Sequence, residues 1–161
     1  MDTLILETTE KLLDQVGWNL LRELQRDARI GYSELGRRVG LSSPAVAERV
    51  RRMEEAGIIK GYHAEIDLER VGLPVVAFIL IRVAGTACAE TKQLLAQMPE
   101  VLECHRLTGA DSLLVKVAVP HVTYLEELIN QIGVYGETNT SLLLSSQAPK
   151  PILGPVAPLA E

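Results

Sequence analysis

Residues 32–61 decide the fold of this chain, and they read YSELGRRVGLSSPAVAERVRRMEEAGIIKG. The stretch predicts two short helices joined by a tight turn. Ser33 is the expected cap of the first helix, and Gly40 can adopt the left-handed conformation that ends it. Ser42 or Ser43 can then cap the second helix, which we expect to end near Gly57. This is the layout of a helix-turn-helix pair.

The second helix of the pair is predicted to have one buried face and one exposed face. Val46, Val50 and Met53 lie at positions i, i+4 and i+7, so they share the buried side. Arginine in a helix can bond guanine O6 and N7 together in the major groove. We therefore expect base contacts from the opposite side, which presents Ser43, Ala45, Glu48, Arg49 and Arg52. The alternative is a solvated face, supported by the i,i+4 pairs Glu48–Arg52 and Arg51–Glu55.

Contacts with DNA phosphates would set the register of the helix pair without reading sequence. The candidates are Arg37, Arg38, Arg51 and Lys60, whose alternative role is solubility. From Arg29 to Lys60 the chain has seven basic and four acidic residues, a net charge of +3, whereas the whole chain has a net charge of −5. Each protomer therefore offers a modest electrostatic contribution, and several protomers would have to act together.

Length and composition allow a sizeable core in one domain or two small ones, because 47% of the 161 residues are hydrophobic. The first residues, MDTLILETTEK, lack the basic region of a secretory signal. The longest apolar run, residues 75–81, is too short to span a bilayer. Cys88 and Cys104 are the only cysteines and form no disulfide framework. We expect a soluble, cytoplasmic protein with no membrane partner.

Two more elements are predicted around the helix pair. Residues 14–28 show the periodicity of an amphipathic helix, with Leu20, Leu21 and Leu24 on one side. After Gly57, the segment IIKGYHAEID is rich in β-formers and predicts a strand or wing. The prediction is a winged helix-turn-helix domain over residues 1–62, followed by a strand and linker over residues 63–74.

The second half of the chain changes pattern. Strands are predicted over residues 75–83, 101–107, 113–119 and 138–145, with a helix over 87–98 and another after Pro120. The order β-α-β-β-α-β is that of a ferredoxin-like domain, placed over residues 75–147, so the fold class is α+β. The first strand is apolar on both sides, which favours self-association through the sheet face that no helix covers.

The C-terminal residues 148–161 form a proline-rich tail, for which a disordered end is preferred over an arm packed on a neighbouring protomer. The remaining residues that could suggest chemistry are His63, Cys104, His105 and His121. Cys104 and His105 are adjacent on a strand and point to opposite faces, which makes them poor joint ligands. We therefore predict no catalytic residues, no metal site and no cofactor, and no enzymatic activity.

Three stretches carry a resemblance to a known family. They are LDQVGWNLLRELQRDARIGYSELGRRVGLSSPAVAERVRRMEEAGIIKGYHAEID, VLECHRLTGADSLLVKV and TNTSLLLS. Together, over about residues 13–146, they resemble the leucine-responsive/asparagine regulator (Lrp/AsnC, feast/famine) family of transcription factors. The chain departs from that pattern in three places. Gly17 stands where the family often has an acidic residue, Ser43 comes between the first serine and Pro44, and the hairpin loop at Gly109-Ala110-Asp111 is one residue shorter.

The resemblance implies a homodimer built through the ferredoxin-like domains, tetramers or octamers of such dimers, and several helix pairs bound to one double-stranded DNA. It also implies a small amino acid as effector, bound between C-terminal domains with the hairpin loop in the site. The candidate effector residues are Gly109, Ala110, Asp111, Ser112, Thr138 and Thr140. Asp111 can hold an α-ammonium group, backbone N–H groups near Gly109 can hold an α-carboxylate, and the others offer hydroxyls. Ordinary turn and strand chemistry explains the same residues equally well.

The expected function is therefore a transcriptional regulator whose assembly or DNA affinity changes with an amino-acid effector. Two alternatives stay open. One is a DNA-binding architectural regulator with no effector response. The other is a ferredoxin-like small-molecule-binding protein or enzyme that uses the helix pair as an interaction module.

Overall fold

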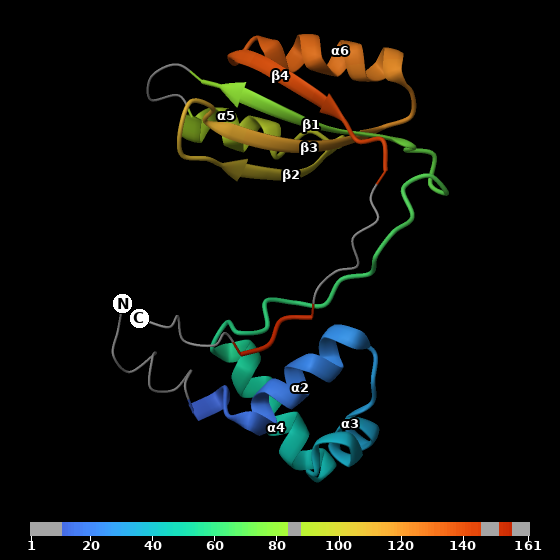
Figure 1. Cartoon of the computed structure of the whole chain (residues 1–161), viewed down its shortest axis with the longest axis vertical. Coiled ribbons are helices and arrows are strands. Elements are labelled where there is room, and N and C mark those ends of the chain that lie inside the picture. The colour runs from blue at the N-terminus through green and yellow to red at the C-terminus, as the bar shows by residue number, and fades with distance from the viewer. Residues whose placement is uncertain (1–10, 84–87, 146–151, 156–161) are drawn as a thin grey trace. The chain divides into compact units, whose positions relative to one another are not determined.

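The structure is a computed structural model that describes residues 11–83, 88–145 and 152–155 (Figure 1). The chain divides into two compact units. Residues up to Ala64, together with residues from Pro149 onward, form the first, and Glu65–Ala148 forms the second. We call them the helical unit and the sheet unit. The chain thus leaves the helical unit, builds the sheet unit and returns. No helix within the described ranges is long and apolar enough to cross a membrane.

The helical unit contains α2 (Gln15–Arg26), α3 (Tyr32–Val39) and α4 (Ser43–Glu55). The predicted turn is confirmed, because α3 ends at Gly40 with φ of 76° and α4 begins after Ser42, whose hydroxyl accepts from the Ala45 N–H. The predicted cap of α3 is wrong. Gly31 is the N-cap residue and Ser33 lies inside the first turn, because the backbone already turns into helix two residues earlier.

The core of the helical unit is small and apolar. Its buried members are Leu20, Leu24, Leu35, Val46 and Val50. The predicted buried face of α4 is confirmed, since Val46, Val50 and Met53 have no exposed surface. Because these side chains fix the rotation of α4 about its axis, they also decide which residues face solvent.

Gly17, one of the departures from the family pattern, has a structural reason. A Cβ atom at this position would lie 1.9 Å from the backbone oxygen of Leu12, which passes over the first turn of α2. No other residue fits there without moving that segment. Leu12 itself is buried, with 2% of its surface exposed, so the close approach secures a core side chain.

The strand predicted after Gly57 is not formed within the chain. Residues 58–67 form no strand. All four strands of the described chain pair with one another in the sheet unit, so none of them lies beside this segment as a partner. An extended segment needs a neighbouring strand for its backbone hydrogen bonds. Ile59 nevertheless packs on the core of the helical unit.

The sheet unit runs β1 (Val75–Arg82), α5 (Cys88–Leu95), β2 (Val101–Arg106), β3 (Leu113–Val119), α6 (Val122–Gly133) and β4 (Glu137–Leu142). Its strands are antiparallel in the order β2-β3-β1-β4 (Figure 1). This confirms the ferredoxin-like β-α-β-β-α-β arrangement. The last strand ends three residues earlier than predicted, and Leu143 makes one more hydrogen bond to Val76.

The two faces of the sheet differ. Ala77, Ile79 and Ile81 of β1 are fully buried, and they form one core with side chains of β3, α5 and α6. On the other face of β1, Val76, Phe78 and Leu80 stay half-buried. Both helices therefore cover the same face, and the open face carries the apolar side chains that the sequence predicted.

Candidate DNA-binding and effector sites

The solvent side of α4 is the candidate DNA-reading surface. Glu48 and Arg52 are exposed there, as predicted, and Ser43 and Ala45 are half-buried near the helix start. Across the described residues, no hydrogen bond or ion pair engages the Arg52 guanidinium. The neighbouring Arg51 is occupied, because it bonds Glu48 at 2.8 Å and also Glu55. The predicted Arg51–Glu55 pair is thus present, whereas Glu48 bonds Arg51 in place of Arg52.

Arg49 differs from the other predicted reading residues. Its Nη1 and Nη2 atoms donate to the Oδ1 and Oδ2 atoms of Asp14 at 2.7 and 2.6 Å, and only 27% of its side chain is exposed. Asp14 is also the N-cap of α2, accepting from the Gly17 N–H at 2.7 Å. The Arg49 guanidinium, with help from that N–H, lowers the pKa of Asp14 from 3.8 to about 2. Arg49 therefore ties α4 to the start of α2.

The predicted phosphate contacts lie on exposed side chains, most of them already paired. Arg37 binds both carboxylate oxygens of Glu34, at 2.7 and 2.8 Å, and Arg38 bridges Glu34 to Glu23 at 2.8 Å each. The Arg37 and Arg38 guanidiniums hold the pKa of Glu34 at about 2. Lys60 is exposed, and no ion pair to it occurs among the described residues. Sequence reasoning missed Asp14 and Glu23 as partners.

The hairpin loop between β2 and β3 holds four of the six candidate effector residues. Ser112 ties it to the end of β1, because its N–H donates to the Ile81 oxygen at 2.9 Å and its hydroxyl lies within 3.4 Å of both backbone polar atoms of Val83. The Ser112 hydroxyl is therefore already engaged. Gly109 and Ala110 are exposed at the tip, and Asp111 is half-buried.

Arg82, at the end of β1, organises this loop. Its Nε donates to the Ala110 oxygen at 3.2 Å, its Nη1 bonds Glu137 at 2.9 Å, and its Nη2 lies 3.7 Å from Asp111. Asp111, the predicted partner of an ammonium group, thus has a cation beside it. The sequence contained a signal for Arg82, since it is the only charged residue in an otherwise apolar strand.

Thr138 and Thr140 lie on β4, opposite Ile81 and Ile79 of β1. Cross-strand partners point to the same side of a sheet, so both threonines face the side that the helices cover. Thr138 reaches the same end of the sheet as the hairpin loop, because Ile81 bonds Ser112 as well. Thr140 is two residues farther along. The structure thus brings Thr138 and the loop residues to one sheet end and leaves Thr140 away from it.

The described residues contain no group of three or more His, Cys, Asp or Glu side chains that could hold a metal ion. His105 instead lies 3.2 Å from Glu103, which also binds Lys116 at 2.9 Å. These contacts place His105 and Glu103 on the open face of the sheet, while Cys104 packs on the core.

Comparison with known proteins extends over both units. Residues 13–54 match the AsnC-type helix-turn-helix domain, and residues 76–152 match the Lrp/AsnC ligand binding domain. The HTH-type transcriptional regulator LrpC of Bacillus subtilis is 35% identical over 133 residues, which are 83% of this chain and 92% of LrpC. Its solved structure superposes with a TM-score of 0.81, covering 86% of this chain and 99% of LrpC.

A second solved structure adds a ligand. The transcriptional regulator NMB0573 of Neisseria meningitidis, solved as a complex with L-Met, is 26% identical with a TM-score of 0.79. The match covers 88% of this chain and 96% of that one. With the helix-turn-helix, the ferredoxin-like sheet and both domain matches in family order, the chain belongs to the Lrp/AsnC family of HTH-type transcriptional regulators.

Proposed function

We propose that this protein is a sequence-specific DNA-binding regulator that places α4 in the major groove. The observation that carries the proposal is the exposed Arg52 guanidinium, which makes no hydrogen bond or ion pair among the described residues and lies on the side of α4 away from Val46, Val50 and Met53. A free guanidinium at that position can bond guanine O6 and N7 together. Ser43, Ala45 and Glu48 complete the proposed reading surface.

Arg49 is given a different role. Its bidentate pair with Asp14 positions α4 against α2, so the side chain supports the reading surface rather than contacting bases. The pair is partly screened by solvent, yet bidentate geometry between a guanidinium and a carboxylate is the favourable arrangement.

Phosphate contacts are assigned to Arg37, Arg38, Arg51 and Lys60. Exposed ion pairs contribute little free energy, so a phosphate can replace Glu34 or Glu48 as a partner at small cost. The whole chain carries a net charge of −5, and each helix pair adds little attraction. Binding by a homo-oligomer, which presents several helix pairs, compensates for that weakness.

The open face of the sheet is the proposed dimer surface. Val76, Phe78, Leu80 and Leu114 form its apolar centre, and the ion pair Lys116–Glu103 lies beside them. A contiguous apolar surface on a soluble chain is typical of a protein contact. Higher assemblies of such dimers, tetramers or octamers, remain part of the proposal.

A small amino acid is the proposed effector, because the sheet unit matches a ligand binding domain and a related structure holds L-Met. Asp111 would hold the α-ammonium group, and Arg82 stands close enough to the loop to bind an α-carboxylate. Binding between protomers would shift the assembly equilibrium and with it the DNA affinity. The second candidate, a regulator without effector, is favoured by the Arg82–Asp111 contact, which already places a cation 3.7 Å from the loop carboxylate.

Mobility-shift titration of the DNA next to the protein's own gene tests the reading surface. Arg52→Ala should weaken binding by about 1–3 kcal/mol and relax the preference at one base pair. Lys60→Ala should weaken binding to all DNA sequences alike and reduce the salt dependence of the binding affinity. Arg106→Ala, which removes an exposed arginine from β2, is the matched control. Unchanged affinity and preference in Arg52→Ala would show that α4 does not read bases through this face.

Calorimetry against the twenty amino acids tests the effector. We expect one or a few of them to bind, and Asp111→Asn to weaken that binding while retaining the fold. Native mass spectrometry with and without the bound amino acid reports the change of assembly. If none of the twenty amino acids binds, the protein is a DNA-binding regulator without an amino-acid effector.

A further inference from the structure

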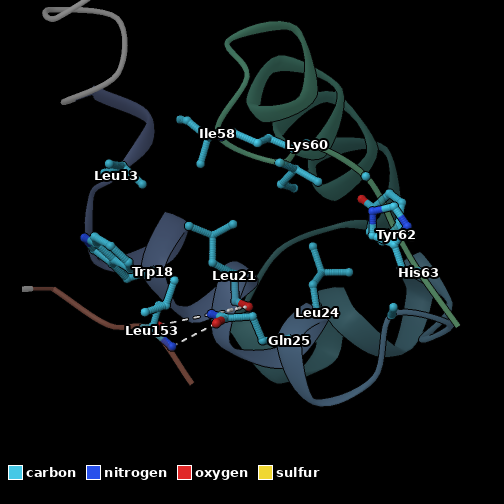
Figure 2. A pocket seen from close by; sticks show the side chains of 13 residues that line it. Leu13, Trp18, Leu21, Leu24, Gln25, Ile58, Lys60, Tyr62, His63 and Leu153 are labelled. Carbon is cyan, nitrogen blue, oxygen red and sulfur yellow. Dashed lines mark hydrogen bonds between the residues drawn. The ribbon is translucent and has the colours of Figure 1, made fainter. Parts of the chain in front are cut away.

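The C-terminal tail makes a specific contact with the helical unit. Gln25 of α2 bonds both backbone groups of Leu153, because its Oε1 accepts from the Leu153 N–H at 2.8 Å and its Nε2 donates to the Leu153 oxygen at 3.1 Å (Figure 2). The two residues are 128 positions apart in the chain. Residues 152–155 are therefore not a free end, whereas the rest of the predicted disordered tail, residues 148–151 and 156–161, lies outside the described residues.

The Gln25 carboxamide recognises backbone rather than a side chain. It pairs with one residue as a neighbouring β-strand would, and this requires that residue to be extended with a free N–H. Leu153 as a whole keeps 69% of its surface exposed, so its burial contributes little to the contact. Gln25 is also held in place, since its Nε2 lies 3.1 Å from the Leu21 oxygen on the same helix.

An apolar cavity adjoins the clamped residue Leu153. A cavity of about 380 Å³ lies between α2 and residues 58–63, walled by Trp18, Leu21, Leu24 and Ile58, with Leu153 at its edge (Figure 2). A second cavity of about 230 Å³ is lined by Ile152, Leu153 and again Trp18. Trp18 and Leu153 thus line both cavities.

We propose that α2 carries a docking site for extended polypeptide, and that its occupant is this chain's own C-terminal segment, residues 152–155. Gln25 supplies the specificity through the Leu153 backbone, and Trp18 supplies the apolar wall. The match to the ligand binding domain ends at residue 152, so the clamped residue lies just beyond the part that the family shares.

The test uses the full-length protein and two signals. Trp18 is the only tryptophan of the chain, so its emission reports the docking site directly. Hydrogen exchange at the amide of residue 153 reports the clamp. We expect Gln25→Ala to speed that exchange about tenfold, as the loss of one net hydrogen bond predicts, and to shift Trp18 emission to longer wavelength. Leu153→Pro removes the N–H donor and should give the same emission shift.

Matched variants separate the clamp from general perturbation. Leu153→Ala retains both backbone groups, so the amide of residue 153 should stay slow to exchange. Gln131→Ala, on the exposed side of α6, should change neither signal. Both signals should also be independent of protein concentration, because the occupant belongs to the same chain.

Three results would overturn the proposal. The first is an amide of Leu153 that exchanges as fast in the native chain as in Gln25→Ala. The second is a Leu153→Ala chain that loses the protection, which would make the side chain the determinant. The third is loss of both signals on dilution, which would assign the site to the tail of a second copy. None of these results depends on DNA binding.

Discussion

The helical unit and the sheet unit are held together differently. Among the described residues, the main apolar cluster of the sheet unit has thirteen buried members and that of the helical unit has five, so polar contacts make up a larger share of the interactions that hold the helical unit together. These are polar links between segments far apart in the chain: Asp14–Arg49, Glu23–Arg38 and Gln25–Leu153. The helical unit thus depends more on charge and hydrogen bonds, and the sheet unit depends more on apolar burial.

This difference matters for regulation. Apolar burial responds little to pH, so the core of the sheet unit should stay intact when the pH changes. Ion pairs that are half-exposed respond to both salt and pH. We expect conditions that leave the sheet intact to alter the geometry of α4, and the following predictions are ways to separate the two units.

The largest effect is expected in the sheet core. Ile79→Ala removes a fully buried side chain from β1 and should lower the free energy of unfolding of the sheet unit by about 2–5 kcal/mol, because a cavity remains. Urea denaturation followed by circular dichroism measures it. Leu102→Ala is the control, because Leu102 on β2 is 42% exposed. It should change the free energy of unfolding by no more than about 0.5 kcal/mol. Trp18 emission should report little change in either variant if the units unfold independently.

The next effect concerns the close approach at α2. Gly17→Ala should destabilise the helical unit by about 1–3 kcal/mol, because the new methyl group would overlap the Leu12 oxygen. Gly133→Ala is the matched change in a helix with open space around it, and it should be neutral or stabilising by about 0.4–1 kcal/mol. The two variants are compared by their midpoints of urea unfolding, followed by Trp18 emission and by circular dichroism. Equal changes of stability in Gly17→Ala and Gly133→Ala would contradict a close approach of the Leu12 oxygen to Gly17.

A smaller effect is expected from the link between α2 and α4. A double-mutant cycle of Asp14→Ala and Arg49→Ala should give a coupling of about 0.5–1 kcal/mol, reduced from the value of a buried pair because Asp14 is 45% exposed. Arg49→Ala should also weaken DNA binding equally for all sequences. A changed preference at a single base pair would instead restore Arg49 to the reading surface.

The smallest effect is the pH dependence of the same link. The pKa of Asp14 is lowered in the folded chain, so its stabilising contribution is complete above the ordinary value of 3.8 and is lost as the pH falls towards about 2. Trp18 emission in urea, measured between pH 5 and 2, should show this loss in the native chain and less of it in Arg49→Ala. Asp67→Asn, which removes the local pair with Arg70 in the linker, should retain the native profile. If stability depended on pH in the same way in the native chain and in Arg49→Ala, the Asp14–Arg49 pair would not be the cause of the acid sensitivity.

Much of the fold could be predicted because its signals are local. Val46, Val50 and Met53 recur with the helical period, and Gly40 marks the end of α3 within the same few residues. The strands of the sheet unit follow from apolar runs and turn residues in sequence order. Their predicted boundaries differ by a few residues at the ends, where backbone pairing with a neighbour decides the last hydrogen bond.

The candidate sites could be predicted only in part. Arg49 and Arg52 look equivalent in sequence, three residues apart on one helix, and only the position of Asp14 distinguishes them. The same holds for Arg82, whose three partners come from the hairpin loop and from β4. The strand expected after Gly57 was not formed, because β-formers alone do not supply a partner strand.

By itself, the sequence determined the order of the elements, the buried face of α4 and the membership of the Lrp/AsnC family. These depend on residue types at short spacing, which set backbone conformation and burial directly. Only the tertiary structure decided that Arg49 is paired with Asp14 while Arg52 makes no ion pair among the described residues, which cation stands beside the hairpin loop and where residues 152–155 lie. Those outcomes depend on contacts between segments as much as 128 residues apart, and no local pattern encodes such distances.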